Sequence, residues 1–302
     1  MRTPTRIVVL IGAEQVPHRY VARTLAQLDN VSIVVARQPR RRLMERLIRA
    51  AKRPWVTVPR KLLQLALRLT GESARRQADL ARVLGDPKIP PSVRVYKTAG
   101  VNSHETQSLL RKLAPDILCV YGTLIASHAT LSIAPLALNL HTGMSPRYRG
   151  ADCEFWPLHQ GELDWIGATV HRCTSYVDGG AIYRTEAAML EPDDGLGAVF
   201  GRCVVTGSRL YRTVVQDLVL MQEVETLPQV LSDGREYKSA MRGWLAEIRV
   251  MRSINRGSIR DYVKQNRAKA YQRPAACRMD FPEAERQALN TATGRYSNGE
   301  ER

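Results

Sequence analysis

The sequence predicts an α/β protein whose mostly parallel, twisted sheet is flanked by helices, with a basic helical insertion and a helical C-terminal extension. Residues 6–12 form an uninterrupted, β-branched apolar run, which is typical of a parallel strand covered on both faces. Residues 16–28 then repeat apolar side chains at helical spacing, and a second apolar run at 31–36 completes a strand–helix–strand unit. Further apolar runs at 116–122 and 133–140 continue the alternation. A chain of 302 residues is long enough for one large domain of this kind with additions.

The remaining elements follow the same alternation along the chain. We expect strands or extended segments at 93–97, 166–172, 181–190 and 235–237. We expect helices at 103–113, 151–160, 194–220, 240–251 and 258–269. Asp193 or Asp194 is the expected N-cap of the longest of these helices.

These elements divide the chain into four parts. We expect residues 1–36 and 86–237 to form the main domain, residues 37–85 the insertion, and residues 238–272 the helical extension. The tail at 273–302 is polar, contains prolines and shows no periodicity, so we expect it to be disordered.

Most of the positive charge of the chain lies in the insertion. The formal net charge is +16, and residues 37–76 contain 13 Lys and Arg but only 2 Asp and Glu, which is +11 of that total. Apolar residues between positions 43 and 51 share one helical face surrounded by arginines, and Pro54 and Pro59 are expected to break this pattern. Further helices are expected at 61–69 and 73–84. Such helices suit the surface of an anionic membrane; the alternative is that they pack on the same domain or on the second subunit of a homodimer.

The composition argues against a disulfide framework and against a zinc site. The five cysteines are Cys119, Cys153, Cys173, Cys203 and Cys277. Their number is odd and no pair has Cys-x-x-Cys spacing, so we expect reduced, mostly buried thiols in a cytoplasmic protein without a metal. The first apolar run is too short for a signal peptide, and no run approaches the length of a membrane span. Any membrane contact is therefore expected to be peripheral, at the inner face.

A strand that ends in a Gly/Ser/Pro loop carries the strongest candidates for a functional site. Asn139 and His141 lie two residues apart at the end of this strand, so their side chains point to the same face. The carboxyl ends of parallel strands are where open α/β sheets bind ligands. Asp178 precedes two glycines in the turn after a later strand, and taken alone it is typical of a turn former.

In their order along the chain, these motifs resemble the signature of folate-dependent formyltransferases. The first part is Asn-x-His followed by Ser-Pro-Arg-Tyr-Arg-Gly at 139–150, and the second is Gly-Ala-Thr-Val-His at 167–171 followed by Asp-Gly at 178–179. Over about residues 6–237 without the insertion, the chain is similar to the catalytic domain shared by glycinamide ribonucleotide formyltransferase, methionyl-tRNA formyltransferase and sugar N-formyltransferases. The resemblance implies a Rossmann-like sheet, 10-formyltetrahydrofolate as the formyl donor, and chemistry without a metal.

The resemblance also assigns the chemistry to Asn139, His141 and Asp178. In formyl transfer an amine attacks the formyl carbon, and the formyl oxygen becomes negative. Asn139 would donate a hydrogen bond to this oxyanion. His141 would either donate to the oxyanion or take the proton of the amine. Asp178 would orient His141, hold a water molecule or relay protons.

A pterin pocket beside these residues is a further implication of the resemblance. One wall would consist of Tyr121, Gly122, Thr123, Leu124 and Ile125. The other would consist of Tyr176, Val177 and Asp178. Backbone groups can read the donor and acceptor edge of a pterin, while apolar side chains cover its face. Arg147, Arg149 and His171 are candidates for binding the acceptor substrate; the alternatives are solvated loop arginines and a structural histidine.

Two features that the sequence lacks, a phosphate-binding loop and a C-terminal barrel, narrow the choice of acceptor substrate. The turn after the first strand, at 12–17, contains one glycine and a glutamate, so it is a poor phosphate cradle and argues against a ribonucleotide. The region after residue 207 is helical in pattern, which argues against the C-terminal barrel of the tRNA enzyme. An amino sugar, often nucleotide-linked, or the amine of a natural-product precursor is therefore the first expectation, and a methionyl-tRNA or glycinamide ribonucleotide formyltransferase is the alternative. The small-molecule amine is the expected partner, and nucleic acid is not; a non-catalytic basic protein that binds nucleic acid or an anionic membrane is the alternative from another class.

Overall fold

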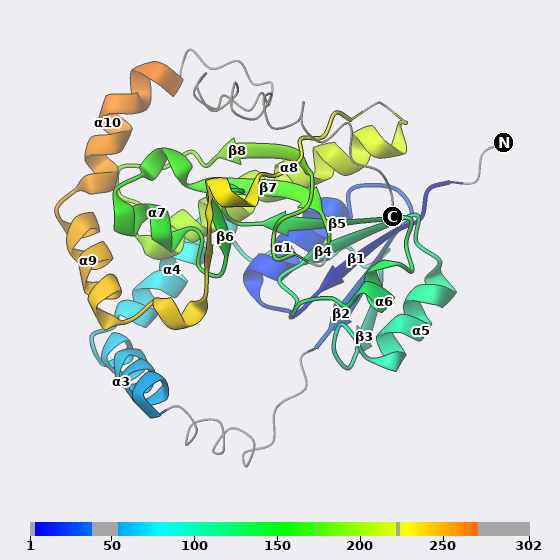
Figure 1. The fold of residues 1–302 in the computed structure, drawn as a ribbon, viewed down its shortest axis with the longest axis horizontal. Helices are drawn as coiled ribbons and strands as arrows, with labels where there is room; N and C mark the ends of the chain where they lie inside the picture. Colours follow the sequence, from blue (N-terminus) through cyan, green and yellow to red (C-terminus); the bar gives the residue numbers. More distant parts are fainter. Residues whose placement is uncertain (1–3, 38–53, 175, 222–223, 271–302) are drawn as a thin grey trace.

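The computed structural model describes residues 4–37, 54–174, 176–221 and 224–270. Seven strands form one sheet in the order β3-β2-β1-β4-β5-β7-β8, with helices on both faces (Figure 1). The strands are β1 Ile7–Ile11, β2 Val31–Ala36, β3 Arg94–Thr98, β4 Ile117–Tyr121, β5 Leu136–His141, β7 Gly167–Arg172 and β8 Ile182–Ala187. The first five pair in parallel, whereas β7 pairs antiparallel with both β5 and β8. The predicted fold class is confirmed.

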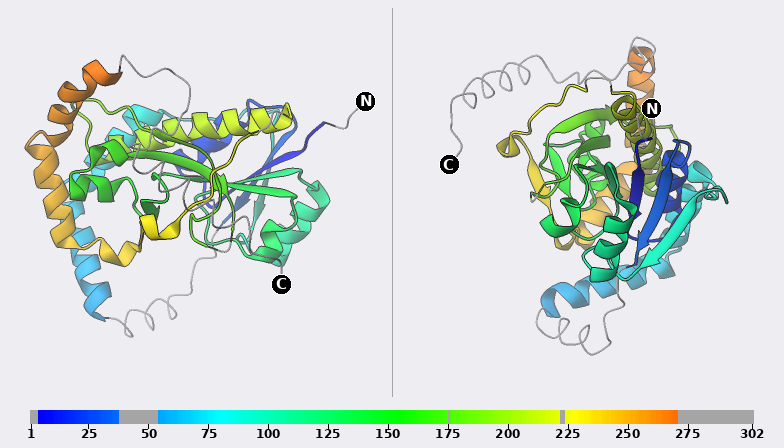
Figure 2. Two further views of the ribbon diagram at one scale, coloured as in Figure 1. Left: turned by 45° about the horizontal axis from the view of Figure 1, so that its top comes forward. Right: turned by 90° about the vertical axis from the view of Figure 1, so that its right-hand side faces the viewer.

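Helices and a small second sheet surround this core. The helices are α1 Val16–Leu25, α3 Pro54–Leu69, α4 Glu72–Leu84, α5 His104–Leu113, α6 His128–Leu131, α7 Phe155–Gln160, α8 Leu196–Val219, α9 Trp244–Asn255 and α10 Ser258–Ala270. Short 3-10 segments are η1 Leu163–Trp165, η2 Leu231–Asp233 and η3 Ser239–Met241. Strands β6 Tyr148–Gly150 and β9 Arg235–Tyr237 pair in parallel beside the large sheet. Helices α3, α9 and α10 follow one side of the molecule (Figure 2).

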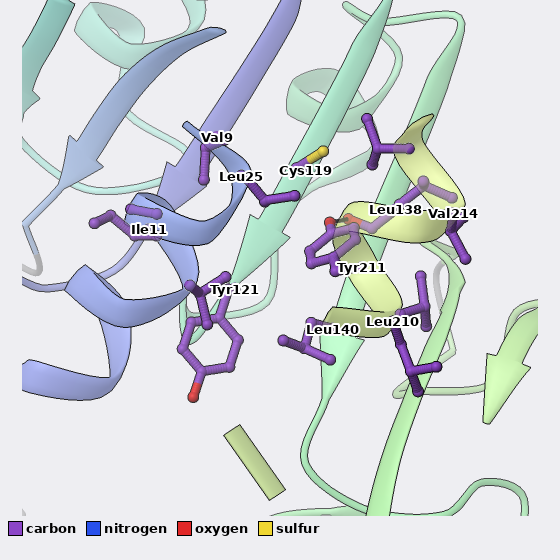
Figure 3. Packing of buried hydrophobic residues seen from close by; sticks show 14 of the residues in the cluster. Val9, Ile11, Leu25, Cys119, Tyr121, Leu138, Leu140, Leu210, Tyr211 and Val214 are labelled. Carbon is purple, nitrogen blue, oxygen red and sulfur yellow. Dashed lines mark hydrogen bonds between the residues drawn. The ribbon is translucent and has the colours of Figure 1, made fainter. Parts of the chain in front are cut away.

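The alternation of side chains along the strands builds one core on each face of the sheet. Cys119 and Tyr121 of β4 and Leu138 of β5 face α1 and α8, within a large buried cluster (Figure 3). Leu118 and Val120 point the other way, into a second cluster on the side of α5. Because side chains alternate along a strand, Asn139 and His141 point away from the face that α8 covers.

Helix α4 belongs to the predicted insertion, yet it packs along α8. Leu84 at its end is buried in the same cluster as the strands. Val83 lies close to Gly201 of α8, where a side chain would crowd it. The division of the chain into main domain, insertion and extension stays a prediction, and the tail at 273–302 and the helix expected near 43–51 lie outside the described residues.

The structure corrects three local predictions. The helix expected from residue 61 begins at Pro54 and continues through Pro59, which lies in its second turn and removes only one backbone hydrogen bond there. Gly195, not an aspartate, is the N-cap of α8, because Asp194 instead accepts hydrogen bonds from Arg202. Strand β6 was not expected, since its three residues are too few to show alternation.

The cysteines that the structure describes are unpaired thiols. Burial raises the pKa of Cys119 to about 12, so this thiol stays protonated and inert. None of the described helices is long and apolar enough to cross a lipid bilayer.

Candidate active site

The site lies where β5 ends, next to the strand that reverses the direction of the sheet. Asn139 and His141 are on β5, and the antiparallel register places Asn139 directly opposite His171 of β7. The chain then turns between β7 and β8, and this turn brings Asp178 back over the end of β5. The predicted residues Asn139, His141 and Asp178 are therefore brought together, and His171 joins them.

Asp178 is the centre of this group. One carboxylate oxygen, Oδ1, lies 3.2 Å from Nδ2 of Asn139 and 3.3 Å from Nε2 of His171. The other, Oδ2, lies 3.3 Å from Nδ1 of His141 and accepts a hydrogen bond of 2.9 Å from the Gly150 backbone amide. The side chains of His141 and His171 are only 7% and 3% exposed, so these contacts are largely screened from water.

The charges around Asp178 keep it ionised. Burial raises the pKa of its carboxyl group, but the positive charge of His141 and a hydrogen bond from His171 outweigh burial, together with the amide of Gly150. The pKa of Asp178 therefore lies well below its usual range. A permanent anion therefore sits between the two histidine rings.

Hydrogen bonds to the backbone fix both imidazole rings. Nε2 of His141 donates to the Tyr148 carbonyl at 2.9 Å, while Nδ1 faces Asp178. Both ring nitrogens of His141 therefore face an oxygen that can accept a hydrogen bond. In His171, Nδ1 donates to the Arg172 carbonyl at 2.9 Å, which leaves Nε2 between Asn139 and Asp178.

The amide of Asn139 is engaged on both sides. Its Nδ2 lies 3.2 Å from both Asp178 and His171, and these contacts are at the long end of hydrogen bonding. Long contacts of this kind are exchanged at low cost for a ligand oxygen, and catalytic hydrogen bonds often tighten only when substrate is bound.

The turn that carries Asp178 is held in place from two sides. Asp178 has a φ of 47°, in the left-handed region that aspartate tolerates better than most residues. Gln229 donates to the carbonyls of Asp178 and Gly180, at 3.0 and 2.6 Å. Arg149 donates to the Val177 carbonyl at 3.4 Å. The role of Gln229 could not be predicted from the sequence, because this residue lies 51 residues from Asp178 in a segment without a motif.

The segment expected to line a pterin pocket begins at the buried end of β4. Tyr121 contributes only its backbone, because its side chain belongs to the core cluster on the opposite face (Figure 3). Gly122 follows with a φ of 58°, and a Cβ there would lie 2.5 Å from the ring of His18. His18 of α1 contacts the Gly122 carbonyl at 3.3 Å, and burial lowers its pKa. The sequence did not single out this histidine, since it lies on an ordinary helix.

The apolar side chains expected to cover a pterin are uncovered in the structure. Leu124, Ile125 and Tyr176 are 50%, 72% and 67% exposed. Leu124 and Ile125 follow β4, whereas Tyr176 lies two residues before Asp178. Thr123, which precedes Leu124, donates to the Leu124 carbonyl at 2.7 Å, so its hydroxyl shapes the loop. Exposed apolar side chains beside buried polar groups are typical of a ligand pocket.

The two loop arginines are occupied by protein groups. Arg147 donates two hydrogen bonds to Glu162, at 2.9 and 2.8 Å, and stacks over the ring of Trp165. Arg149 is only 8% exposed and donates to the Leu231 carbonyl at 3.2 Å as well as to the turn of Asp178. Both guanidinium groups are thus held by protein oxygens, although Nε of Arg149 is buried without a hydrogen-bond partner among the described residues. We propose a structural role for both, and substrate binding by Arg147 and Arg149 stays an untested prediction.

Among the described residues, one cluster of carboxylates could in principle hold a metal ion. It consists of Glu191, Asp193 and Asp194, whose ligand atoms lie within 4.8 Å of one another. Arg202 pairs with Glu191 at 2.6 Å and with Asp194 at 3.0 Å, and Arg82 lies beside all three. The arginines neutralise these carboxylates, so we assign them to an ion-pair network around the buried Asp194.

The chain is similar to a known protein family and to known enzymes. The family model described as formyl transferase matches residues 5–215. The methionyl-tRNA formyltransferase of Dehalococcoides mccartyi is 30% identical over 138 residues, which are 45% of this chain and 42% of that protein. The corresponding enzyme of Pelotomaculum thermopropionicum is 28% identical over 156 residues, or 48% and 49% of the two chains. The chain therefore spans less than half the length of each of these relatives.

Among solved structures, a sugar N-formyltransferase from Shewanella sp FDAARGOS_354 superposes with a TM-score of 0.50. The superposition covers 82% of this chain and 86% of that protein, at 12% sequence identity. At this level of identity the match shows a shared fold and no more.

Proposed function

The chain belongs to the formyl transferase family, and we propose that it transfers a formyl group from 10-formyltetrahydrofolate to a primary amine. One observation carries the proposal. Asn139, His141 and His171 converge on the ionised Asp178 at the carboxyl edge of the sheet. An amide, an imidazole and a buried carboxylate together are the groups that acyl transfer to an amine requires.

Formyl transfer replaces the bond between carbon and the folate nitrogen with a bond to the acceptor nitrogen. One proton has to leave the amine, and one has to reach the released nitrogen. The negative charge that develops on the formyl oxygen has to be stabilised, and the donor supplies only the formyl group. The side chains around Asp178 therefore have to handle these protons and stabilise this negative charge.

His141 is the proton donor in this proposal. Its ring nitrogens face the Tyr148 carbonyl and Asp178, so the protonated ring can donate to the formyl oxygen by exchanging one of these contacts. Asn139 supplies a second donor in the same way. Asp178 stays anionic throughout and orients His141 and His171. A water molecule held by Asp178 takes the proton that leaves the amine and passes one to the released folate nitrogen, so the protons balance. One such donor contributes on the order of 10²–10³ in rate.

The residues present fit a folate beside this group. The backbone of Tyr121 and Gly122 lies at the carboxyl end of β4, next to β5, and can face the polar edge of a pterin. Leu124, Ile125 and Tyr176 are exposed and apolar, as the face of a pterin requires. We propose that this segment and the turn of Asp178 form the two walls of the donor site.

For the acceptor, we propose an amino sugar or another small amine. The turn after β1 carries Glu14, which pairs with Lys97 at 3.0 Å and also with Arg37. The loop has a single glycine and Glu14 engages the cations beside it, so it makes a poor cradle for the phosphate of a ribonucleotide. The described residues after α8 contain strand β9 and the helices α9 and α10, and they do not form a barrel.

A second candidate acceptor is methionyl-tRNA. The sequence identity of 28–30% to methionyl-tRNA formyltransferases favours it, and the net charge of +16 is compatible with it. A non-catalytic basic protein would not need Asn139, His141 and Asp178 in contact, so we rank that alternative below both enzymes.

One experiment tests the proposal and separates the acceptors. The purified protein is incubated with 10-formyltetrahydrofolate and, in turn, nucleotide-linked amino sugars, glycinamide ribonucleotide and charged initiator tRNA, with mass spectrometry of the products. We expect formylation of an amino sugar, and its loss in Asp178→Asn. Formylation of the tRNA alone would move the assignment to the second candidate. If no amine in the panel is formylated and 5-formyltetrahydrofolate does not bind, the proposal is wrong.

A further inference from the structure

Helix α3 exposes a stripe of apolar side chains to solvent. Val58, Leu62, Leu65 and Leu69 are 53%, 61%, 51% and 78% exposed. They are spaced four, three and four residues apart, so they lie on one face of the helix. Leu63 and Leu67 on the opposite face are half-buried, and Lys61 and Arg68 at the edge of the stripe are exposed. The helix is therefore held to the protein by one apolar face and presents a second one outward.

Helix α9 continues this side of the molecule with positive charge. Leu245, Arg249, Arg252 and Arg256 are exposed and follow the same spacing of four, three and four residues. Trp244 beside them is 55% exposed. Together with Ser253, Ser258 and Asp261, the three arginines line a groove of about 590 Å³ between α9 and α10.

The three arginines on the outer face of α9 do not take part in the ion pairs that hold this helix to the protein. Arg76 and Arg242, which face inward, pair with Glu247 at 2.8 and 2.7 Å. Within the part of the chain that the structure describes, no ion pair engages the three arginines of the outer face. Their charge is thus available to an external anionic partner.

The two stripes are carried by neighbouring helices. Helix α3 contacts α9, and α3, α9 and α10 lie along one side of the molecule in both views (Figures 1 and 2). The bridge from Arg76 of α4 to Glu247 of α9 fixes α9 to the body of the protein. Arg242 also pairs with Asp152 at 2.6 Å, in the loop that follows β6. The surface is therefore joined firmly to the loop beside the candidate active site.

We infer that this face, formed by the outer stripes of α3 and α9, docks on the anionic surface of a lipid bilayer. Aliphatic side chains and a tryptophan on the outside of a helix enter the boundary between head groups and acyl chains, while arginines beside them meet the lipid phosphates. A nucleic acid would use the arginines but would leave four aliphatic side chains of α3 in water. The inference differs from the sequence-based expectation for residues 37–76, because half of the surface comes from α9.

Vesicle binding of the full-length protein tests the inference. Sedimentation is measured with vesicles of phosphatidylcholine alone and with vesicles that contain one-third phosphatidylserine, at low and high salt. We expect binding to the anionic vesicles only, and weaker binding at high salt. Each basic residue near an anionic bilayer contributes about 1 kcal/mol, or a factor of about five, so R249Q/R252Q/R256Q should bind about 100-fold more weakly.

Two further variants separate this surface from charge in general. The matched control is R94Q/R111Q/K112Q, which removes three exposed charges from β3 and α5, away from α9 (Figure 1); it should bind at least tenfold more tightly than the α9 variant. L62S/L65S/L69S keeps every charge, and it should lose vesicle binding while its thermal unfolding is unchanged. Trp244 should shift its fluorescence to shorter wavelength on binding, and W244F should lose that shift.

Several results would overturn the inference. Equal losses in the control and the α9 variant would show unspecific attraction of a basic protein. Unchanged vesicle binding in L62S/L65S/L69S, with a change from dimer to monomer in analytical ultracentrifugation, would assign the apolar stripe to a second copy of this chain. Binding to double-stranded DNA or RNA that requires the α9 arginines and displaces the vesicles would assign the surface to nucleic acid.

Discussion

Gly143 lies under the ring of His141, and adding a single methyl group there tests the importance of the ring position. In Gly143→Ala the new Cβ would lie 2.5 Å from Nε2 of His141 and still closer to Cβ of Cys153. The methyl group is blocked by Cys153 on one side, so the imidazole has to yield. Ordinary contact begins near 3.4 Å, which requires a shift of roughly 1 Å, and a misplacement of this size at a catalytic group costs on the order of 10² in rate.

We expect Gly143→Ala to lower the rate of formyl transfer about 100-fold while the protein stays folded. The measurement is the rate of product formation with saturating donor, together with chemical denaturation, where overpacking should cost about 1–3 kcal/mol. Gly243→Ala is the matched control, because nothing lies within 4 Å of its added Cβ. Gly143→Ala combined with Cys153→Gly should recover part of the rate, since the methyl group can then move away from His141. A wild-type rate in Gly143→Ala would refute the assignment of His141 as the proton donor in the position that the structure shows.

Three further predictions concern other groups of the structure. Asn139→Ala should keep its affinity for 5-formyltetrahydrofolate but lose about 10²–10³ in maximal rate, because an oxyanion donor acts mainly in the transition state; a loss of folate affinity at unchanged rate would make Asn139 a binding residue. The pKa of Asp178 is lower in the folded than in the unfolded protein, so its contribution to stability is present above pH about 4 and is lost as the pH falls below that value. The difference in unfolding free energy between wild type and Asp178→Asn should therefore shrink on acidification, and a constant difference from pH 7 to pH 3 would contradict this. Tyr211→Phe should lower the free energy of unfolding by about 1 kcal/mol, because its hydroxyl donates 2.7 Å to the Leu138 carbonyl in the core; denaturation without a shift of the midpoint would show that another group replaces the bond.

The sequence predicted the buried part of the fold because continuous apolar runs leave few alternatives. Strand β2 and strand β9 were expected with the bounds that they have in the structure. The failures lie where tertiary contacts override local preference. Asp194 would cap α8 by propensity, but the charge of Arg202 holds its side chain elsewhere. Helix α3 continues through Pro59, because the loss of one hydrogen bond in the second turn does not end a helix of 16 residues.

The composition of the candidate site was predictable, but its internal contacts were not. The spacing of Asn139 and His141 placed them on one face of a strand, and the turn at Asp178 was expected to return to the same edge. The position of His171 opposite Asn139 depends on the antiparallel register of β7, which the sequence does not reveal. The use of Arg149 as a support for the turn of Asp178 also depends on the fold, since an arginine in a loop is exposed by default.

The group around Asp178 is proposed to catalyse formyl transfer, and a single-turnover experiment tests this role most directly. Enzyme in excess over 10-formyltetrahydrofolate is mixed with the best acceptor amine, and the formylated product is followed for wild type and for His141→Ala. Loss of a positioned acid or base costs on the order of 10²–10⁴ in rate, so we predict a loss of that size with unchanged binding of 5-formyltetrahydrofolate. If His141→Ala binds the folate and forms product at the wild-type rate, the chemistry does not depend on His141, and the catalytic role proposed for this group is contradicted.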